Sequence, residues 1–184
     1  MRKLLAALPL ITGLSFAQYF DGDVVREFGV KTGLVKVKYN SIDGTEPDKT
    51  LEEFFSVYGY MGARTTAGFT AGASVELATG SKMTKNRMII YTALELNPAV
   101  ELNLSENLRA HTGFGGSINR FKERAGGRTN EDTNFGLQFF LGAKLNLTPT
   151  FGLLGEYKGK IFMTGDYDGD VVHHLNLGLF FLIH

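Results

Sequence analysis

Apolar and polar side chains alternate without interruption from Met88 to Leu104. The even positions carry no charge, and the odd positions become polar from Glu95 onward. A period of two is typical of a β-strand with one apolar and one polar face. At about 3.3 Å per residue this segment would extend roughly 55 Å, far more than a usual globular strand of about five or six residues. Such a length favours a closed barrel whose tilted strands cross a bilayer and continue beyond it.

Shorter alternating segments predict further strands, about eight in all. Their ranges are 28–39, 54–63, 69–77, 108–115, 135–147, 151–163 and 175–183. The parity of the apolar positions changes within the first of them, and a bulge near Gly33 and Leu34 would reconcile its two halves. For the second segment the pattern does not say which face points outward.

The connections between these segments alternate in length. Polar or charged stretches predict long loops over 40–53, 79–86, 119–133 and 165–170. Short turns are expected over 64–67, 105–107 and 148–150. Long loops at one end and short turns at the other are typical of up-and-down barrels that cross a membrane. With an even number of strands, both chain ends lie on the side of the short turns.

The first residues have the features of a secretory signal peptide. Arg2 and Lys3 precede an apolar stretch over 4–14, and Ser15-Phe16-Ala17 provides a cleavage site before Gln18. We therefore expect residues 1–17 to be a signal peptide and residues 18–184 to be the barrel. No other apolar stretch approaches about 20 residues, so a membrane-spanning helix is not expected.

Composition fits an exported all-β domain. The 184 residues suffice for one domain, and the absence of cysteine excludes disulfides and thiolate chemistry. Nineteen basic and nineteen acidic residues balance, which removes the electrostatic case for nucleic-acid binding. Twenty-three glycines, only four prolines and many aromatic residues favour strands joined by tight turns.

These features together resemble the small outer-membrane barrels of the OmpA/OmpX-like group, over roughly residues 24–184. Similar hairpin turns at 104–108 and 147–151 add to the resemblance, although the chain ends in His184 where such barrels usually have an aromatic residue. The resemblance implies an up-and-down antiparallel transmembrane β-barrel in the outer membrane of a diderm bacterium. It also implies a monomer in contact with outer-membrane lipids and lipopolysaccharide, inserted by the barrel-assembly machinery.

If the apolar faces meet lipid, the charged faces form the barrel interior. Unpaired buried charges are costly, so this arrangement requires an ion network between strands. Its expected members are Lys36, Lys38, Glu76, Glu95, Glu101, Arg109, Lys144, Glu156, Lys158 and Lys160. An interior of about eight strands is just filled by side chains. We therefore expect a structural or envelope-anchoring role with externally exposed loops.

Three alternatives remain open at this stage. A narrow conduit for small or hydrophobic solutes needs a gap in the interior network. A soluble, periplasmic, lipocalin-like ligand-binding barrel would turn its apolar face inward. A lipid-modifying barrel enzyme needs a Ser-His-acid cluster, and the spacing of His111, His173 and His174 establishes none. We therefore assign no catalytic residue and expect no enzyme.

Two charged segments suggest surface ligands. Asp166, Asp168 and Asp170 resemble the start of a calcium loop without its distal glutamate, which suggests weak Ca²⁺ or Mg²⁺ binding. A solvated acidic loop is the simpler interpretation. The basic segment 120–128 can contact lipid phosphates through charge-assisted hydrogen bonds, or can be a mobile charged loop. No cofactor is expected.

Overall fold

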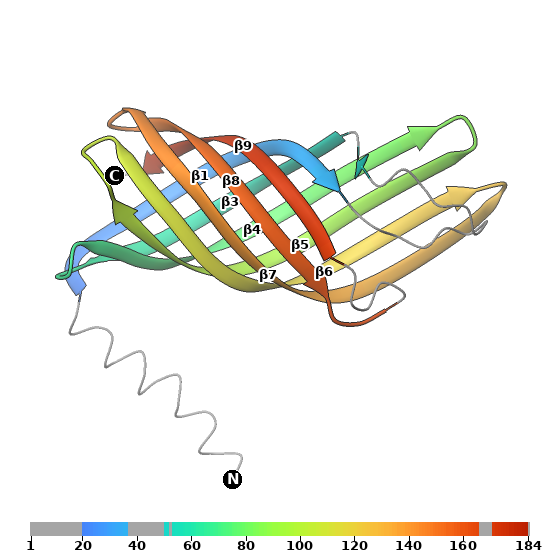
Figure 1. Ribbon diagram of the computed structural model, residues 1–184, viewed down its shortest axis with the longest axis horizontal. Coiled ribbons are helices and arrows are strands. Elements are labelled where there is room, and N and C mark those ends of the chain that lie inside the picture. Colours follow the sequence, from blue (N-terminus) through green and yellow to red (C-terminus); the bar gives the residue numbers. More distant parts are fainter. Residues whose placement is uncertain (1–19, 37–49, 52, 166–170, 184) are drawn as a thin grey trace, which may run out of the picture.

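The computed structural model is a closed antiparallel β-barrel, and it describes residues 20–36, 50–51, 53–165 and 171–183 (Figure 1). The long strands are β1 (Phe20–Lys36), β3 (Glu53–Thr65), β4 (Phe69–Thr84), β5 (Arg87–Asn103), β6 (Leu108–Ala125), β7 (Arg128–Thr148), β8 (Phe151–Phe162) and β9 (Val171–Ile183). The short β2 (Thr50–Leu51) pairs with the end of β1. Neighbours in sequence pair in order, and β1 pairs with β9 to close the barrel. The predicted all-β, up-and-down fold of eight long strands is confirmed, while the expected signal peptide over 1–17 lies outside the described residues.

The closing seam between β1 and β9 runs without a shift from Arg26, opposite Ile183, to Lys36, opposite His173. The bulge predicted near Gly33 and Leu34 is therefore wrong. Parity is preserved along this part of β1, so Val35 points inward and is fully buried. The register shift of β1 lies instead between Phe20 and Val24, in its pairing with β3.

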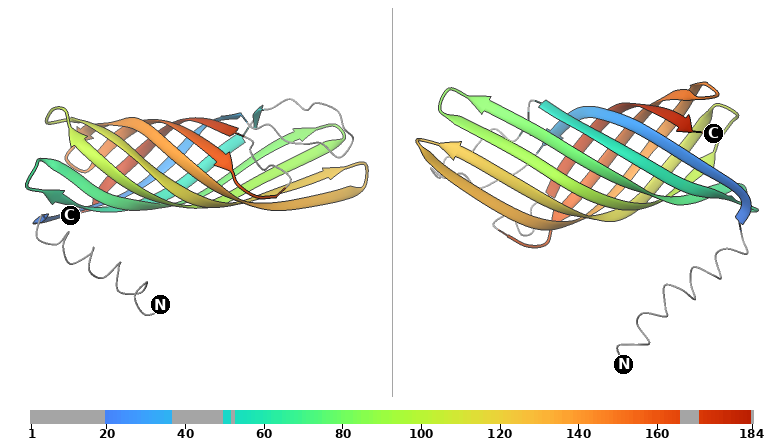
Figure 2. Two further views of the ribbon diagram at one scale, coloured as in Figure 1. Left: turned by 60° about the horizontal axis from the view of Figure 1, so that its bottom comes forward. Right: turned by 180° about the vertical axis from the view of Figure 1, so that it is seen from behind.

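Two of the predicted long loops are strands. β4 and β5 pair as far as Thr84 and Arg87, and β6 and β7 pair as far as Ala125 and Arg128. Gly126 and Gly127 make the second hairpin turn with φ of 56° and 77°, which glycine adopts without strain. Residues 82–92 and 120–133 thus form a four-stranded continuation of the wall, named here the extended sheet, which projects beyond the other strands (Figure 2). Residues 79–86 and 119–133 were predicted to be loops, and on β6 and β7 the outward positions there, such as Arg120, Lys122 and Glu131, are no longer apolar.

The opposite end of the barrel carries the short turns, and β1 begins and β9 ends there (Figure 1). The predicted turns near 105–107 and 148–150 are present there, and Gly68 closes the turn after β3 by donating its N–H to Thr65 O at 3.1 Å. On β3, whose orientation the pattern left open, Tyr58 and Tyr60 point inward and Phe55 points outward.

The outward face of the barrel is an apolar belt. Large hydrophobic side chains are exposed on every long strand, among them Phe28, Leu34, Phe55, Met61, Leu77, Leu94, Leu96, Phe114, Ile118, Phe135, Leu137, Leu141, Leu153, Ile161, Leu175, Leu177 and Phe181. An apolar surface of this extent is stable in a bilayer rather than in water. The soluble lipocalin-like alternative is therefore wrong, because it requires these side chains inside. Separately, the described part of the chain contains no helix suited in length and hydropathy to crossing a bilayer.

The interior is filled by two apolar clusters and by charged side chains. The cluster toward the extended sheet comprises Val35, Leu51, Phe54, Ala78, Ile89, Tyr91, Ala93, Phe121, Phe162 and Val172. The cluster toward the chain ends comprises Tyr58, Tyr60, Ala99, Phe140, Leu154 and Phe180. The charges gather between these clusters and among the residues of the second.

Candidate functional site: the charged interior

Five carboxylates and five cations face the interior of the membrane-spanning part, and each is at most 8% exposed. They are Glu27, Glu76, Glu95, Glu101, Glu156, Lys31, Arg109, Lys144, Lys158 and Lys160. The two sets cancel in formal charge. A buried set of this kind is tolerated only where each charge has a partner.

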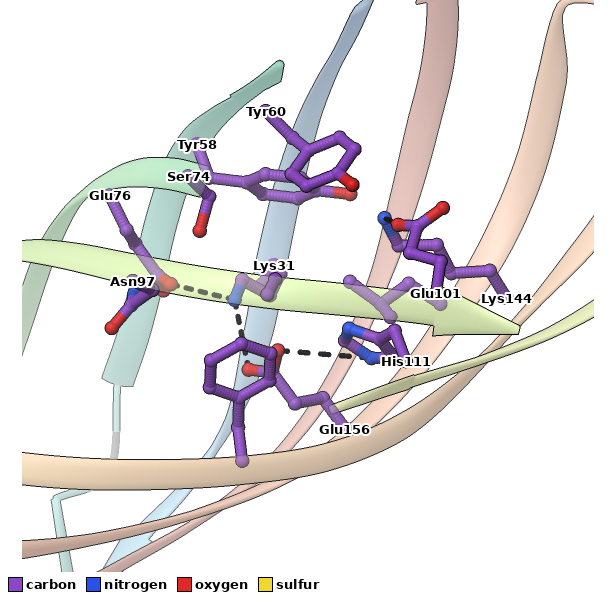
Figure 3. A pocket seen from close by; sticks show the side chains of 13 residues that line it. Lys31, Tyr58, Tyr60, Ser74, Glu76, Asn97, Glu101, His111, Lys144 and Glu156 are labelled. Carbon is purple, nitrogen blue, oxygen red and sulfur yellow. Dashed lines mark hydrogen bonds and ion pairs between the residues drawn. The ribbon is translucent and has the colours of Figure 1, made fainter. Parts of the chain in front are cut away.

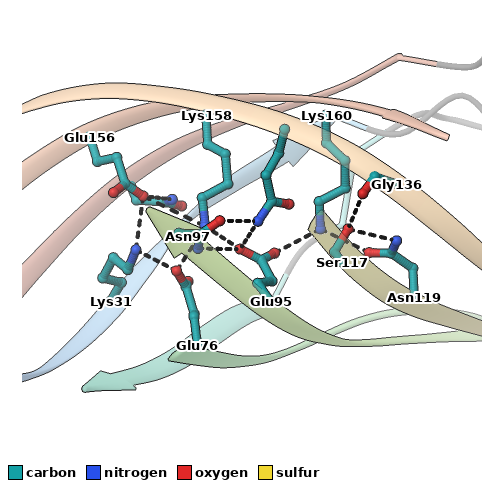
Figure 4. Close-up of polar contacts among 12 residues, drawn as sticks. Lys31, Glu76, Glu95, Asn97, Ser117, Asn119, Gly136, Glu156, Lys158 and Lys160 are labelled. Carbon is teal, nitrogen blue, oxygen red and sulfur yellow. Dashed lines mark hydrogen bonds and ion pairs between the residues drawn. The ribbon is translucent and has the colours of Figure 1, made fainter. Parts of the chain in front are cut away.

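The middle of the barrel is organised around Lys158 of β8. Its Nζ donates to Glu76 Oε2 at 2.8 Å and to Glu95 Oε2 at 2.6 Å (Figure 4). Lys160, two residues further along the same strand, donates to Glu95 Oε1 at 2.7 Å. One strand therefore supplies the cations for two carboxylates on the opposite wall.

Lys31 of β1 continues the network on the other side of Glu76. Its ammonium donates to Glu76 Oε2 at 2.7 Å and to Glu156 Oε1 at 2.9 Å. Glu156 also accepts from Asn176 Nδ2 at 3.2 Å and lies 3.9 Å from His111 Nε2. The wall that carries β8 and β9 is thereby joined to β1 and β4.

Neutral polar groups complete the coordination of the middle network. Gln138 Nε2 donates to Glu95 at 2.9 Å and to Asn97 Oδ1 at 2.5 Å. The ammonium of Lys160 also donates to the Tyr91 hydroxyl at 2.7 Å and to Asn119 Oδ1 at 2.8 Å. Such contacts satisfy donors and acceptors that the ion pairs alone would leave open.

A second network lies nearer the chain ends. Arg109 donates to Glu101 at 2.6 Å and to Glu27 at 3.3 Å. Lys144 donates to the same two carboxylates, at 2.6 Å in the case of Glu27. Two cations and two carboxylates thus form a closed ring in which the charges alternate. The Tyr58 hydroxyl also donates a hydrogen bond to Glu27 at 2.6 Å.

Aromatic rings cover the cations of both networks. Lys31 Nζ lies 4.9 Å from the centre of the Tyr58 ring, and Lys144 Nζ lies 4.9 Å from that of Tyr60. The guanidinium of Arg109 lies 5.1 Å from the centre of the Phe180 ring. These cation–π contacts stabilise charges that have lost water. Tyr58 contacts both networks, through its ring and through its hydroxyl.

A cavity of about 20 Å³ separates the two networks (Figure 3). The Tyr60 hydroxyl, Glu76 Oε1 and His111 Nε2 border it without a hydrogen-bond partner among the protein atoms. This volume suits one water molecule with several polar neighbours. At this level side chains fill the interior.

The structure brings together most of the residues predicted for the interior. Glu76, Glu95, Glu101, Arg109, Lys144, Glu156, Lys158 and Lys160 all lie in the two networks. Lys36 requires a correction: its side chain is exposed on the outer face, because β1 has no bulge and Val35 takes the inward position. Lys38, Asp166, Asp168 and Asp170 lie outside the described residues.

Two charged members of the networks were missed. Glu27 precedes the predicted start of the first strand, and Lys31 lies within that strand but was given no role. The signal was the spacing of Glu27, Lys31 and Val35, since positions four apart share one face of a strand. Extending the predicted strand by one residue toward the N-terminus would have included Glu27, and a strand without the bulge would have placed Lys31 on the same inward face.

The histidines do not form a catalytic or metal site in the described part of the chain. His111 is buried beside Glu156, and His174 is buried against the Phe54 ring at 5.2 Å between ring centres. The neighbouring His173 points outward, where its Nδ1 lies 2.7 Å from the Tyr157 hydroxyl. Among the described residues no serine hydroxyl contacts a histidine ring by a hydrogen bond, and no three histidine or acidic residues gather around a metal position.

Comparisons with known proteins agree with this architecture. No protein-family model and no curated protein matches the sequence. The structure is similar to Ail, the attachment invasion locus protein of Yersinia pestis, with a TM-score of 0.60, 15% identity, and coverage of 87% of this chain and 97% of that one. Neisserial surface protein A gives a TM-score of 0.60 at 15% identity, covering 86% and 96% of the two chains.

A third similar structure is a major outer membrane protein from Thermus thermophilus, with a TM-score of 0.53, 12% identity, and coverage of 86% of this chain and 99% of that one. At identities this low, the structural similarity establishes a shared fold but not a shared role. The apolar belt, the closed seam and these likenesses agree with an outer-membrane location. The chain thus has the fold of the small eight-stranded outer-membrane β-barrels.

Proposed function

We propose that this protein is a filled, non-conducting barrel whose role is structural: it anchors in the outer membrane and holds the extended sheet outside it. The observation that carries the proposal is the filled interior. It holds two ion networks, within each of which the charges balance, and only a cavity of about 20 Å³ separates them. A conduit would need these pairs to open. Breaking one buried pair costs about 3–5 kcal/mol, which opposes spontaneous opening.

The extended sheet supports the external part of this role. β6 and β7 pair in one register from Leu108 and Leu145 to Ala125 and Arg128, so the wall continues without a hinge. On its inner face, Arg87 Nε lies 2.5 Å from Glu123 Oε1. The exposed surface is therefore presented by regular strands that are anchored in the membrane-spanning wall.

We infer the orientation from the start of β1 and the end of β9, which lie on the side of the short turns. An exported chain whose ends and short turns share one side would place that side in the periplasm and the extended sheet outside. In this arrangement the belt contacts outer-membrane lipids and lipopolysaccharide, the barrel-assembly machinery inserts the chain, and the barrel acts as a monomer. Binding of Ca²⁺ or Mg²⁺ by Asp166, Asp168 and Asp170 stays a prediction.

Planar-bilayer recording tests the proposal. The purified protein, shown to be folded by a band shift between boiled and unboiled samples, should insert without stepwise conductance. The conductance of the unaltered protein is compared with that of a variant with Glu76→Gln, Glu95→Gln and Lys158→Met, which removes the ion pairs at the centre of the barrel. Regular conductance steps from the unaltered protein would overturn the filled-barrel proposal in favour of the narrow conduit.

A further inference from the structure

Three basic side chains lie in a row on the outer wall, directly beyond the apolar belt. Arg120, Lys122 and Arg124 occupy alternate positions of β6 and share the outward face with Ile118. The Arg120 side chain is 58% exposed. A cationic row at this level faces the zone where lipid phosphates lie, provided that the extended sheet is outside the membrane as proposed above.

Glu131 of the neighbouring β7 is the acidic group paired with this row. It accepts hydrogen bonds from Lys122 and Arg120, and these bonds hold the pKa of its carboxyl at about 2. Glu131 is therefore ionised at neutral pH and cancels one of the three positive charges. The row keeps an excess of two, and Arg124 has no ion-pair partner among the described residues.

Beside the row the outer wall is hollowed. One groove is lined by Phe55, Leu77, Leu94 and Ile118, and Arg120 also lines it. A larger apolar hollow of about 900 Å³ lies next to it and is lined by Leu96, Pro98, Phe114, Gly116, Phe135 and Leu137. Leu94 and Ile118 border both, so the two depressions are continuous along the wall.

The hollow is built into the sequence at Gly116. This residue takes an outward position between Phe114 and Ile118, and the nearest atom to a Cβ added there is Gly136 O at 3.9 Å. Leu96 is paired with Gly116, and beyond it Pro98 lacks an N–H, so that the pairing of β5 with β6 is interrupted between Leu96 and Ala99. Gly116 therefore leaves space in a belt whose neighbouring positions carry large side chains.

The distance between the two features matches one lipid. Arg120 and Gly116 are four residues apart on the same face, which is roughly 13 Å along the strand. An acyl chain that enters the hollow at Gly116 would thus carry its headgroup to the level of the basic row.

We propose that this face binds one phosphate-bearing lipid of the outer leaflet, with its phosphate on Arg120, Lys122 and Arg124 and an acyl chain in the hollow at Gly116. A guanidinium binds phosphate through two parallel charge-assisted hydrogen bonds, which are stronger than neutral ones. The belt supplies apolar contact for the chain. Charge and shape thus select the same ligand.

Native mass spectrometry of the refolded protein in neutral detergent tests the proposal. The probes are bisphosphorylated lipid A, the same lipid without phosphates, and inorganic phosphate. We expect a lipid A adduct at about tenfold lower concentration than for the dephosphorylated lipid, and no retained inorganic phosphate. If the unaltered protein bound the two lipids equally well, the proposal would be overturned.

Variants then locate the site. The triple change Arg120→Gln, Lys122→Gln and Arg124→Gln should abolish the preference for phosphate, and Gly116→Leu should weaken lipid A binding by filling the hollow. Arg64→Gln, at the opposite end of the barrel, is the matched control and should leave binding unchanged. An undiminished phosphate preference in the folded triple variant would place the lipid elsewhere and refute this site. Conductance is not involved, so this result and that of the filled-barrel test are independent.

Discussion

Glu76 and Glu95 lie directly opposite each other across β4 and β5, and the Oε2 atoms of both accept hydrogen bonds from the ammonium of Lys158. Like charges in directly paired positions destabilise a sheet. Here the pair is held by a cation from the opposite wall, so closure of the barrel is coupled to neutralisation of these two carboxylates. The seam and the interior charge network therefore depend on each other.

Replacing Lys158 with methionine should lower the free energy of unfolding by about 3–5 kcal/mol, because two buried carboxylates lose a shared partner. Urea unfolding in lipid vesicles, followed by the band shift between folded and unfolded protein, measures the change. Lys36→Met is the matched control, since the Lys36 side chain is exposed on the outer face, and it should change stability by less than about 0.5 kcal/mol. Equal losses of unfolding free energy in the two variants would show that the ion pairs of Lys158 do not stabilise the barrel.

Gly142 should not tolerate a side chain. A Cβ at this inward position would overlap His111 Nε2 and the carbonyl oxygen of Gly155. Gly142→Ala is therefore expected to destabilise the barrel by about 1–3 kcal/mol, as overpacking of a filled interior does. Gly155→Ala on the paired strand is the control, because its Cβ would meet nothing closer than Leu177 Cδ2 at 4.0 Å. Similar melting temperatures of the two variants in detergent would contradict the close contact at His111.

The sequence predicts the strands of the belt well because lipid requires apolar side chains at every second position. The alternation from Met88 to Leu104 differs by one residue at each end from β5. Where strands leave the belt this requirement ends, and the outward positions of β6 carry Arg120, Lys122 and Arg124 on regular β-structure that was predicted to be a loop. Backbone pairing continues there without any side-chain pattern to reveal it.

The interior was predictable by face but not by partner. Alternation assigns Glu95 and Lys158 to the polar side of their strands, yet they are 63 residues apart in sequence. Their contact depends on how the strands are staggered when β1 meets β9, and no local pattern encodes that stagger. For Lys36 the face itself was predicted wrongly. The expected bulge in β1 is absent, so its side chain points outward instead of inward.

Tyr58→Phe should reveal the contribution of the hydroxyl that joins the second network. The ring stays in place over Lys31, but Glu27 loses a hydrogen bond of 2.6 Å. Hydrogen bonds to charged groups contribute about 1.5–3 kcal/mol, so a loss of stability in this range is expected. Tyr157→Phe removes the exposed hydroxyl that contacts His173 and should cost clearly less. Urea midpoints of the two variants that fall in the reverse order would refute this role for Tyr58.

The carboxyl of Glu131 should titrate with a pKa of about 2 in the folded protein, because the hydrogen bonds from Lys122 and Arg120 favour its ionised form. A folded-state pKa below the ordinary value means that the stabilising contribution is complete above about pH 4.5 and is lost as the pH falls toward 2. Carboxyl ¹³C NMR in micelles measures the midpoint directly. Lys122→Gln removes the larger influence and should raise the midpoint toward the ordinary value, while Lys36→Gln should leave it unchanged. A midpoint near 4.5 in the unaltered protein would show that these hydrogen bonds do not persist in solution, and Glu131 would then compete less strongly with a lipid phosphate for the basic row.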